Sequence, residues 1–74
     1  MQVLLFGMIA ERAEVGTLEL NAKNMEELRD QLGTRINGLN DLSYSIAVDR
    51  SIVHGEMELS GDEEIAVLPP FAGG

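Results

Sequence analysis

The sequence contains no cysteine, which removes disulfide bonds, thiolate metal ligands and nucleophilic thiols from the chemistry open to it. Small secreted domains often depend on disulfides, so their absence leads us to expect a cytoplasmic protein. No apolar run approaches the ~18 residues of a membrane span, and residues 1–6 lack the basic region of a signal peptide. We therefore expect no membrane association.

Basic residues are scarce, since five Lys and Arg stand against thirteen Asp and Glu and give a formal net charge of −8. This charge repels phosphate backbones and anionic lipids, so nucleic acid is not an expected ligand. The charge would attract a partner with a basic face, but it is equally consistent with a role in solubility alone. The sequence alone does not distinguish between a basic partner and a role in solubility.

The usual catalytic and metal-binding motifs are also missing. There is no phosphate-binding loop and no dinucleotide fingerprint. His54 is the only histidine and stands beside Gly55 in an expected turn, so no metal site is predicted. No serine has an evident base partner, which argues against a hydrolase. The adjacent acids Asp62, Glu63 and Glu64 are typical of a solvated charge run rather than an acid/base pair.

The chain does contain the apolar patterns of a single small α+β domain. A chain of 74 residues has room for one core. Alternation and turn signals predict strands at 3–6, 17–20, 45–49, 52–53 and 64–68. The connection over 8–16 is short enough for a hairpin, and alternation over 56–59 indicates an edge-strand face. We expect a mixed sheet of four to five strands with one main helix on one face.

The main helix is predicted to begin at Met25. Asn24 stands in the cap position, with Glu27 three residues later as in a capping box. Gly33 costs about 1 kcal/mol relative to alanine, so the helix is expected to fray near that residue. The residues that recur at helical spacing and should face the sheet are Met25, Leu28, Leu32 and Ile36.

The strand alternation assigns two faces to the sheet. The residues predicted to face the helix are Val3, Leu5, Ile46, Val48, Ile65 and Val67. Leu4, Phe6 and Leu68 would then form an apolar patch on the opposite face, where no second helix is available to cover it. Such a patch usually marks a partner surface, although single exposed apolar residues are ordinary.

The last seven residues read LPPFAGG. Proline lacks the N–H that a strand ladder needs, so Pro69 and Pro70 should stop the last strand and direct the chain outward. We therefore expect a domain over residues 1–70 and an extended, flexible tail over 71–74, which reaches about 13 Å beyond Pro70. Glycine lets another protein's backbone approach closely, and the reactive group at the tip would be a main-chain carboxylate.

Four segments together resemble the ubiquitin-like sulfur carriers, and within them the small subunit of molybdopterin synthase: VLLFG, NMEELRDQL, AVDRSIV and GDEEIAVLPPFAGG. The resemblance spans nearly the whole chain. Its most specific part is Pro-Pro followed by Gly-Gly, because Gly-Gly alone is shared with ubiquitin and with the sulfur carrier of thiamin synthesis. The resemblance implies a β-grasp fold.

The resemblance also implies a role for each part of the tail. Gly74 would be adenylated by a ubiquitin-activating-type enzyme that uses ATP, and a sulfurtransferase would supply sulfur for a thiocarboxylate. Pro69, Pro70, Phe71, Ala72 and Gly73 would form the segment inserted into the large synthase subunit. Phe6 and Leu68, with Leu4 beside them, would dock the domain. The chain itself would bind no cofactor, and catalytic side chains would lie on the large subunit.

Two other functions remain open at this point. One is a sulfur carrier for thiamin synthesis or another sulfur-transfer pathway. The other is a ubiquitin-like modifier or binding module, in which the tail would form an isopeptide bond or have no chemical role. Removal of Gly74 separates these classes, because a docking module should tolerate it and a carrier should not.

Overall fold

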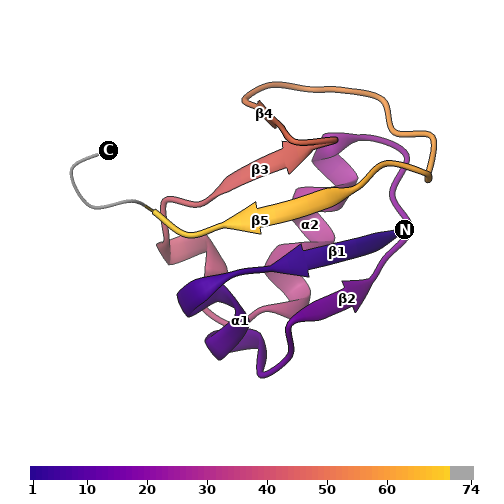
Figure 1. The fold of residues 1–74 in the computed structure, drawn as a ribbon. Coiled ribbons are helices and arrows are strands. Elements are labelled where there is room, and N and C mark those ends of the chain that lie inside the picture. The colour runs from indigo at the N-terminus through magenta and orange to yellow at the C-terminus, as the bar shows by residue number, and fades with distance from the viewer. Residues whose placement is uncertain (71–74) are drawn as a thin grey trace.

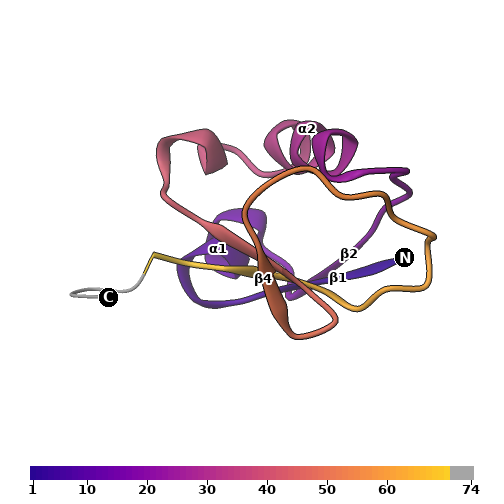
Figure 2. The same ribbon diagram turned by 90° about the horizontal axis from the view of Figure 1, so that it is seen from above.

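Helices cover one face of a five-stranded sheet in the computed structural model, which describes residues 1–70 (Figures 1 and 2). The predicted mixed sheet with one main helix is therefore confirmed. In chain order the elements are β1 (Gln2–Leu5), α1 (Gly7–Ala13), β2 (Thr17–Glu19), α2 (Met25–Arg35), the 3-10 helix η1 (Leu39–Asp41), β3 (Ser45–Val48), β4 (Ser51–Val53) and β5 (Ile65–Leu68).

The strand order β2-β1-β5-β3-β4 places the first and last strands side by side at the centre of the sheet (Figure 1). These two strands run parallel, with Val3 opposite Ile65 and Leu5 opposite Val67, while the other neighbours are antiparallel. Because parallel strands end at the same edge, the start of α1 and the exit from β5 come together. Positions 7 and 69, far apart in sequence, become neighbours in this way.

The core consists of apolar side chains between the sheet and α2. Figure 2 shows α2 lying over one face of the sheet. All six strand residues predicted to face the helix are at most 5% exposed, and the four helix residues predicted to face the sheet are 0% exposed. Burial of a large aliphatic side chain stabilises a fold by about 1.5–3 kcal/mol. Both assignments of the buried faces are therefore confirmed, and the core is completed by Ile9, Leu20, Ala22, Leu39 and Leu59.

The main helix α2 begins where its cap residues predict. Asn24 is extended, and its Oδ1 accepts a hydrogen bond from the Glu27 N–H at 2.9 Å. The Glu27 carboxylate in turn accepts a hydrogen bond from the Lys23 N–H at 3.1 Å, one residue before the cap. Gly33 does not end the helix, which continues to Arg35 because the buried stripe extends to Ile36 on the next turn.

The connection between β1 and β2 differs from the expected hairpin loop, because it contains the helix α1. β1 and β2 do pair antiparallel. Ile9 is fully buried, with Ala10 and Ala13 packed against the same core, so one face of α1 is apolar. The usual capping signals are missing, since Phe6 forms no side-chain cap and Glu14 closes the helix at a positive φ of 63°. The sequence pattern therefore gave little sign of this helix.

The predicted edge strand over 56–59 is wrong. Glu58 takes part only in an isolated bridge, while Glu56 caps the N-terminus of α2. Its Oε1 accepts hydrogen bonds from the Met57 N–H at 2.8 Å and the Met25 N–H at 2.9 Å. These bonds, the Met57 bond above all, hold the pKa of Glu56 below its usual value. A carboxylate here satisfies helix N–H groups that have no partner within the helix.

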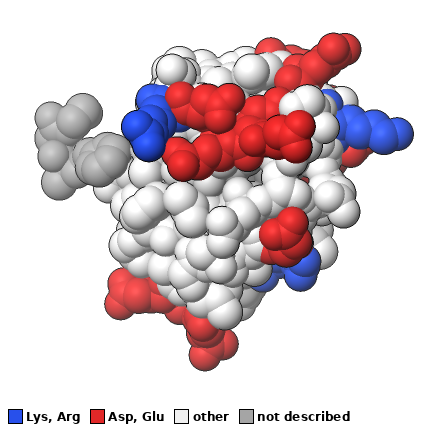
Figure 3. Space-filling model, turned by 45° about the vertical axis from the view of Figure 1, so that its right-hand side comes forward, with Lys and Arg blue, Asp and Glu red and all other residues white. Residues whose placement is uncertain are grey.

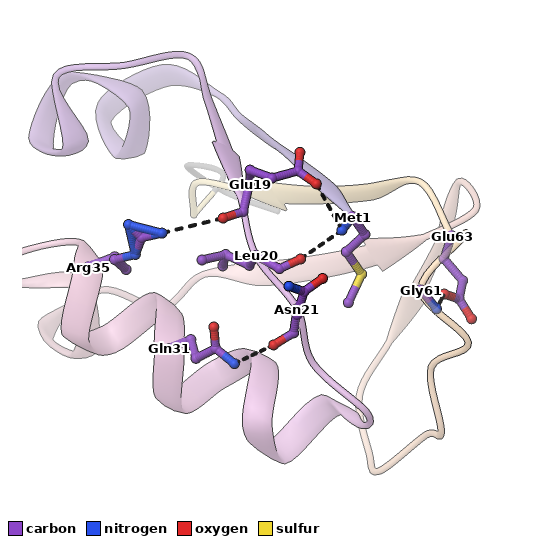
Figure 4. A network of polar contacts seen from close by, with 8 residues as sticks. All are labelled: Met1, Glu19, Leu20, Asn21, Gln31, Arg35, Gly61 and Glu63. Carbon is purple, nitrogen blue, oxygen red and sulfur yellow. Dashed lines mark hydrogen bonds and ion pairs between the residues drawn. The ribbon is translucent and has the colours of Figure 1, made fainter.

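Side chains of α2 also cover main-chain acceptors along β2 and the segment after it (Figure 4). The guanidinium of Arg35 donates to the Glu19 carbonyl at 3.3 Å, and the Gln31 amide donates to the Asn21 carbonyl. On the other side, the Met1 amino group pairs with the Glu19 carboxylate at 3.1 Å. The Arg35 and Gln31 contacts tie β2 and the segment after it to the helix, and they occupy main-chain acceptors that an added strand could otherwise use.

Candidate functional site

The outer face, which we define as the sheet face opposite α2, has a row of apolar residues across four strands. Leu4 lies opposite Ala66, Ala66 opposite Ala47, and Ala47 opposite Ile52. Residues paired across a sheet share a face, so these side chains lie side by side. The two middle residues of this row are small, and Ile52 at its end is 44% exposed.

The other two predicted docking residues lie at the edge of the sheet where β1 and β5 end. Leu68, the last residue of β5, is half-buried. Phe6 continues β1 in extended conformation, with φ −126° and ψ 153°, and is 45% exposed. The alternation along β1 directs Phe6 to the same face as Leu4. The structure thus brings Leu4, Phe6 and Leu68 to one face, and the docking role assigned to them stays a prediction.

The chain leaves the sheet at Pro69 and Pro70, because β5 ends at Leu68 as predicted. Gly7, the first residue of α1, has a positive φ of 55°, and a Cβ placed on it would lie 3.1 Å from Pro69 Cγ. The start of α1 and the exit of the chain are therefore in close contact. The lack of a side chain at Gly7 leaves room for the proline ring.

The remaining residues assigned to the tail lie outside the described residues. These are Phe71, Ala72, Gly73 and Gly74. Their assigned roles in insertion and sulfur attachment stay predictions, as does the division of the chain into a domain over 1–70 and a tail over 71–74.

Glu63 holds the turn that leads into β5. Its carboxylate accepts hydrogen bonds from the Ser60 N–H at 2.8 Å and the Gly61 N–H at 2.9 Å. These two bonds, with Ser60 the larger cause, lower the pKa of Glu63 to about 2. At the start of the strand, the Glu64 N–H donates to Asp49 Oδ1 at 2.9 Å. The acidic turn therefore has a structural role in fixing where β5 begins.

Acidic side chains are unevenly distributed over the surface. Figure 3 shows them gathered in a band across the upper part of one face, above a broad area without charge. Residues 1–70 contain no group of three His, Cys, Asp or Glu side chains that could hold a metal ion. Within the same residues, no helix is long and apolar enough to cross a membrane.

A mixed sheet with parallel β1 and β5 at its centre and α2 packed across one face defines a β-grasp domain, the fold of ubiquitin-like proteins. Residues 3–74 match the ThiS family, and the chain belongs to this family of ubiquitin-like sulfur carriers. Carriers of this type work with activating enzymes and sulfurtransferases. A search of curated proteins found no match to the chain. The resemblance noted from the sequence is thus confirmed at the level of the family.

Sequence reasoning missed two features that shape this site. The sequence predicts Ile52 only as part of a short strand, but its pairing with Ala47 extends the apolar row to the edge strand β4. The contact between Gly7 and Pro69 was not foreseen, because it depends on the parallel pairing of β1 and β5. A signal was present in the glycine that directly follows the first strand, since such a position often marks a close approach of another segment.

Proposed function

We propose that this protein is the sulfur-carrying small subunit of a molybdopterin synthase and that the carboxyl group of Gly74 carries the sulfur. The observation that carries this proposal is the position of Pro69 and Pro70, which leave the sheet beside Phe6 and Leu68. A partner that holds the outer face would therefore meet the residues that follow Pro70. The Pro-Pro preceding Gly-Gly favours the molybdopterin branch of the family.

The proposed chemistry begins with activation of the Gly74 carboxylate. A carboxylate is a poor electrophile, because its leaving group would be oxide. In the proposed first step it attacks the α-phosphate of ATP on a ubiquitin-activating-type enzyme, so that pyrophosphate leaves and an acyl-adenylate forms. The terminal sulfur of a persulfide on a sulfurtransferase then displaces AMP and forms an acyl disulfide with Gly74. A thiol reductant cleaves the S–S bond of this disulfide and leaves a thiocarboxylate on Gly74. ATP is bound by the partner enzyme in this scheme, and this chain needs no cofactor of its own.

In the second stage, the thiocarboxylate enters the large synthase subunit, where its sulfur forms a bond to a pterin precursor. Water then cleaves the bond between this sulfur and the Gly74 carbonyl carbon and returns Gly74 to a carboxylate. The outer face would dock through Leu4, Phe6 and Leu68. Phe71, Ala72 and Gly73 would occupy a narrow passage, where glycine and alanine allow close approach of the partner's backbone. Catalytic side chains would come from the large subunit. We place this reaction in the cytoplasm.

The second candidate is sulfur delivery to thiamin synthesis or another sulfur-transfer pathway. The observation that favours it is the match to the ThiS family, which includes carriers of both branches. A protein modifier that forms isopeptide bonds is a third candidate, which would use the same activation step but transfer Gly74 to a lysine. All three candidates share the activation of Gly74. The two sulfur carriers differ in the acceptor of the sulfur, whereas the modifier transfers the protein itself.

The test is a reconstitution with purified thiocarboxylated protein. We expect dithiolene formation when it is mixed with a molybdopterin synthase large subunit and the pterin precursor, and no reaction with the version that lacks Gly74. A parallel mixture with a thiazole-forming enzyme of thiamin synthesis is the comparison. Sulfur transfer to the thiazole alone would overturn the molybdopterin assignment, and transfer of the intact protein to lysine would overturn the carrier role itself.

A further inference from the structure

A groove lies on the helix side of the sheet, between α2 and the edge strand β4. It has a volume of about 310 Å³, and its lining includes Arg29 from α2, Tyr44 and Ser45 around the start of β3, and Val53 and His54 at the end of β4. An adjoining hollow of about 460 Å³ shares Arg29 and Tyr44 with it. Val53 is paired with the buried residue Ile46, so the groove lies on the opposite side of the sheet from the outer face.

Arg29 is the main charged group of the groove. Two other arginines have partners within the fold. Arg12 donates a hydrogen bond to the Gly38 carbonyl at 3.5 Å, and Arg50 forms an ion pair with Glu64 at 3.6 Å. Arg29 is half-buried, yet within residues 1–70 its guanidinium forms neither a hydrogen bond nor an ion pair. A guanidinium of this kind has its planar set of N–H donors available to a ligand, and that geometry matches a carboxylate or a phosphate.

Two neighbouring side chains add donors to the same groove. Tyr44 is half-buried, and this burial raises the pKa of its hydroxyl, while the nearby charge of Arg29 acts in the opposite direction. The hydroxyl is therefore protonated at neutral pH, and it lies close enough to Arg29 for the charge to act on it. His54 also lines the groove. Its imidazole can donate through a ring nitrogen.

The surroundings limit which anion fits. Asp30 lines the adjoining hollow, and Glu56 is close enough for the charge of Arg29 to help lower its pKa. These acids, together with the net charge of −8, disfavour a doubly charged phosphate more than a singly charged carboxylate. Leu42 and Val53 supply apolar lining beside the donors. A ligand that combines one carboxylate with an apolar group would match both parts of the lining.

We propose that this groove is a binding site for a carboxylate monoanion with an adjoining apolar group, held by the guanidinium of Arg29 and the hydroxyl of Tyr44. The carboxylate can come from an acidic side chain of a protein partner or from a small free acid. The groove lining includes none of the predicted docking residues Leu4, Phe6 and Leu68, so this proposal does not depend on the sulfur-carrier chemistry.

The test is an NMR titration of ¹⁵N-labelled protein with three probes. The first is isovalerate, the second is the blocked dipeptide acetyl-Leu-Glu-amide, and the third is inorganic phosphate. We expect saturable shifts at Tyr44, Ser45 and His54 with at least one carboxylate and none with phosphate. Tighter binding of the dipeptide would identify an acidic side chain as the ligand, and tighter binding of isovalerate a free acid. No saturable shift with either carboxylate, or tighter binding of phosphate, would overturn the proposal.

The affinities of substituted proteins test whether the carboxylate binds in this groove. Arg29→Gln is expected to weaken carboxylate binding by about tenfold or more, because a charge-assisted hydrogen-bond pair is lost. Arg50→Gln removes the same charge from an exposed turn and should bind like the parent protein. Tyr44→Phe keeps the ring and should weaken binding severalfold, which provides a second test if Arg29→Gln does not fold. Parent-like affinity in Tyr44→Phe or in a folded Arg29→Gln protein would show that the groove is not the site.

Discussion

Gly7 lies against Pro69, so that a β-carbon on the glycine would stand only 3.1 Å from the proline Cγ. This contact links the first turn of α1 to the point where the chain leaves the sheet. It exists because β1 and β5 run parallel and end at the same edge. The direction in which the chain leaves the domain therefore depends on a residue more than 60 positions earlier in the sequence.

Replacement of Gly7 tests this contact. Gly7→Val places a branched side chain at a φ of 55° and against Pro69, and we expect a loss of about 2 kcal/mol in the free energy of unfolding. Gly16→Val is the matched control, because a Cβ at Gly16 would meet nothing within 4 Å. That control should change stability by about 0.5 kcal/mol or less. Equal effects of the two substitutions in urea unfolding would contradict the predicted role of Gly7.

Phe6 tests the outer face as a docking surface. Phe6→Ala removes a ring that is 45% exposed, and we expect an affinity loss of about tenfold or more for the activating enzyme, measured by calorimetry. Met57→Ala truncates a side chain that is 38% exposed in the loop beside α2, away from this face, and should bind normally. If the Met57 variant loses as much affinity as the Phe6 variant, the docking surface lies elsewhere.

Leu28 tests the packing of α2 on the sheet. Its side chain is 0% exposed, so Leu28→Ala should lower the free energy of unfolding by about 2–5 kcal/mol. Asp30→Ala, an exposed substitution in the same helix, should cost about 0.5 kcal/mol or less. Thermal or urea unfolding gives both values. A Leu28→Ala protein as stable as its parent would contradict the assignment of the buried helix face.

Glu63 makes stability depend on pH. Its pKa in the fold is about 2, against an ordinary value of 4.5, so the charged form is favoured by folding. The resulting stabilisation is fully present above about pH 4.5 and is lost as the pH falls toward 2. Urea unfolding from pH 7 to 2 should show Glu63→Gln less stable than the parent at neutral pH and nearly equal to it at pH 2.

Asp62→Asn provides the control for that comparison. The Asp62 carboxylate accepts no hydrogen bond from the residues that the structure describes, although it lies in the same turn. We expect this variant to follow the parent protein across the whole pH range. A difference between Glu63→Gln and the parent that stays constant from pH 7 to 2 would show that the Ser60 and Gly61 bonds do not stabilise the charged form.

Local sequence patterns predicted the structure correctly where a single type of residue meets a single structural requirement, such as a helix cap or a strand end. Asn24 predicted the start of α2, the alternation of apolar residues predicted both faces of the sheet, and Pro69 predicted the end of β5. In each case the sequence pattern and the tertiary packing favour the same structure. These features define most of the fold and the position of the candidate docking residues.

Features that depend on contacts between residues far apart in the sequence could not be predicted from local patterns. α1 forms because Ile9 is buried by elements far along the chain, and it has none of the usual capping residues. Glu56 alternates with apolar neighbours as in a strand, but its carboxylate binds N–H groups about 30 residues earlier in the sequence. The groove at Arg29 likewise combines residues from α2, β3 and β4. In all three examples, contacts between residues far apart in the sequence determine the local structure.

The central claim is that Gly74 carries sulfur, and the mass of the intact protein tests it most directly. After incubation with the activating enzyme, ATP and a sulfurtransferase with its sulfur source, we expect a gain of about 16 Da, the difference between a sulfur and an oxygen atom. Gly73→Val should block this gain with little loss of stability. No gain for the parent protein, or a gain that persists when Gly74 is removed, would contradict the claim.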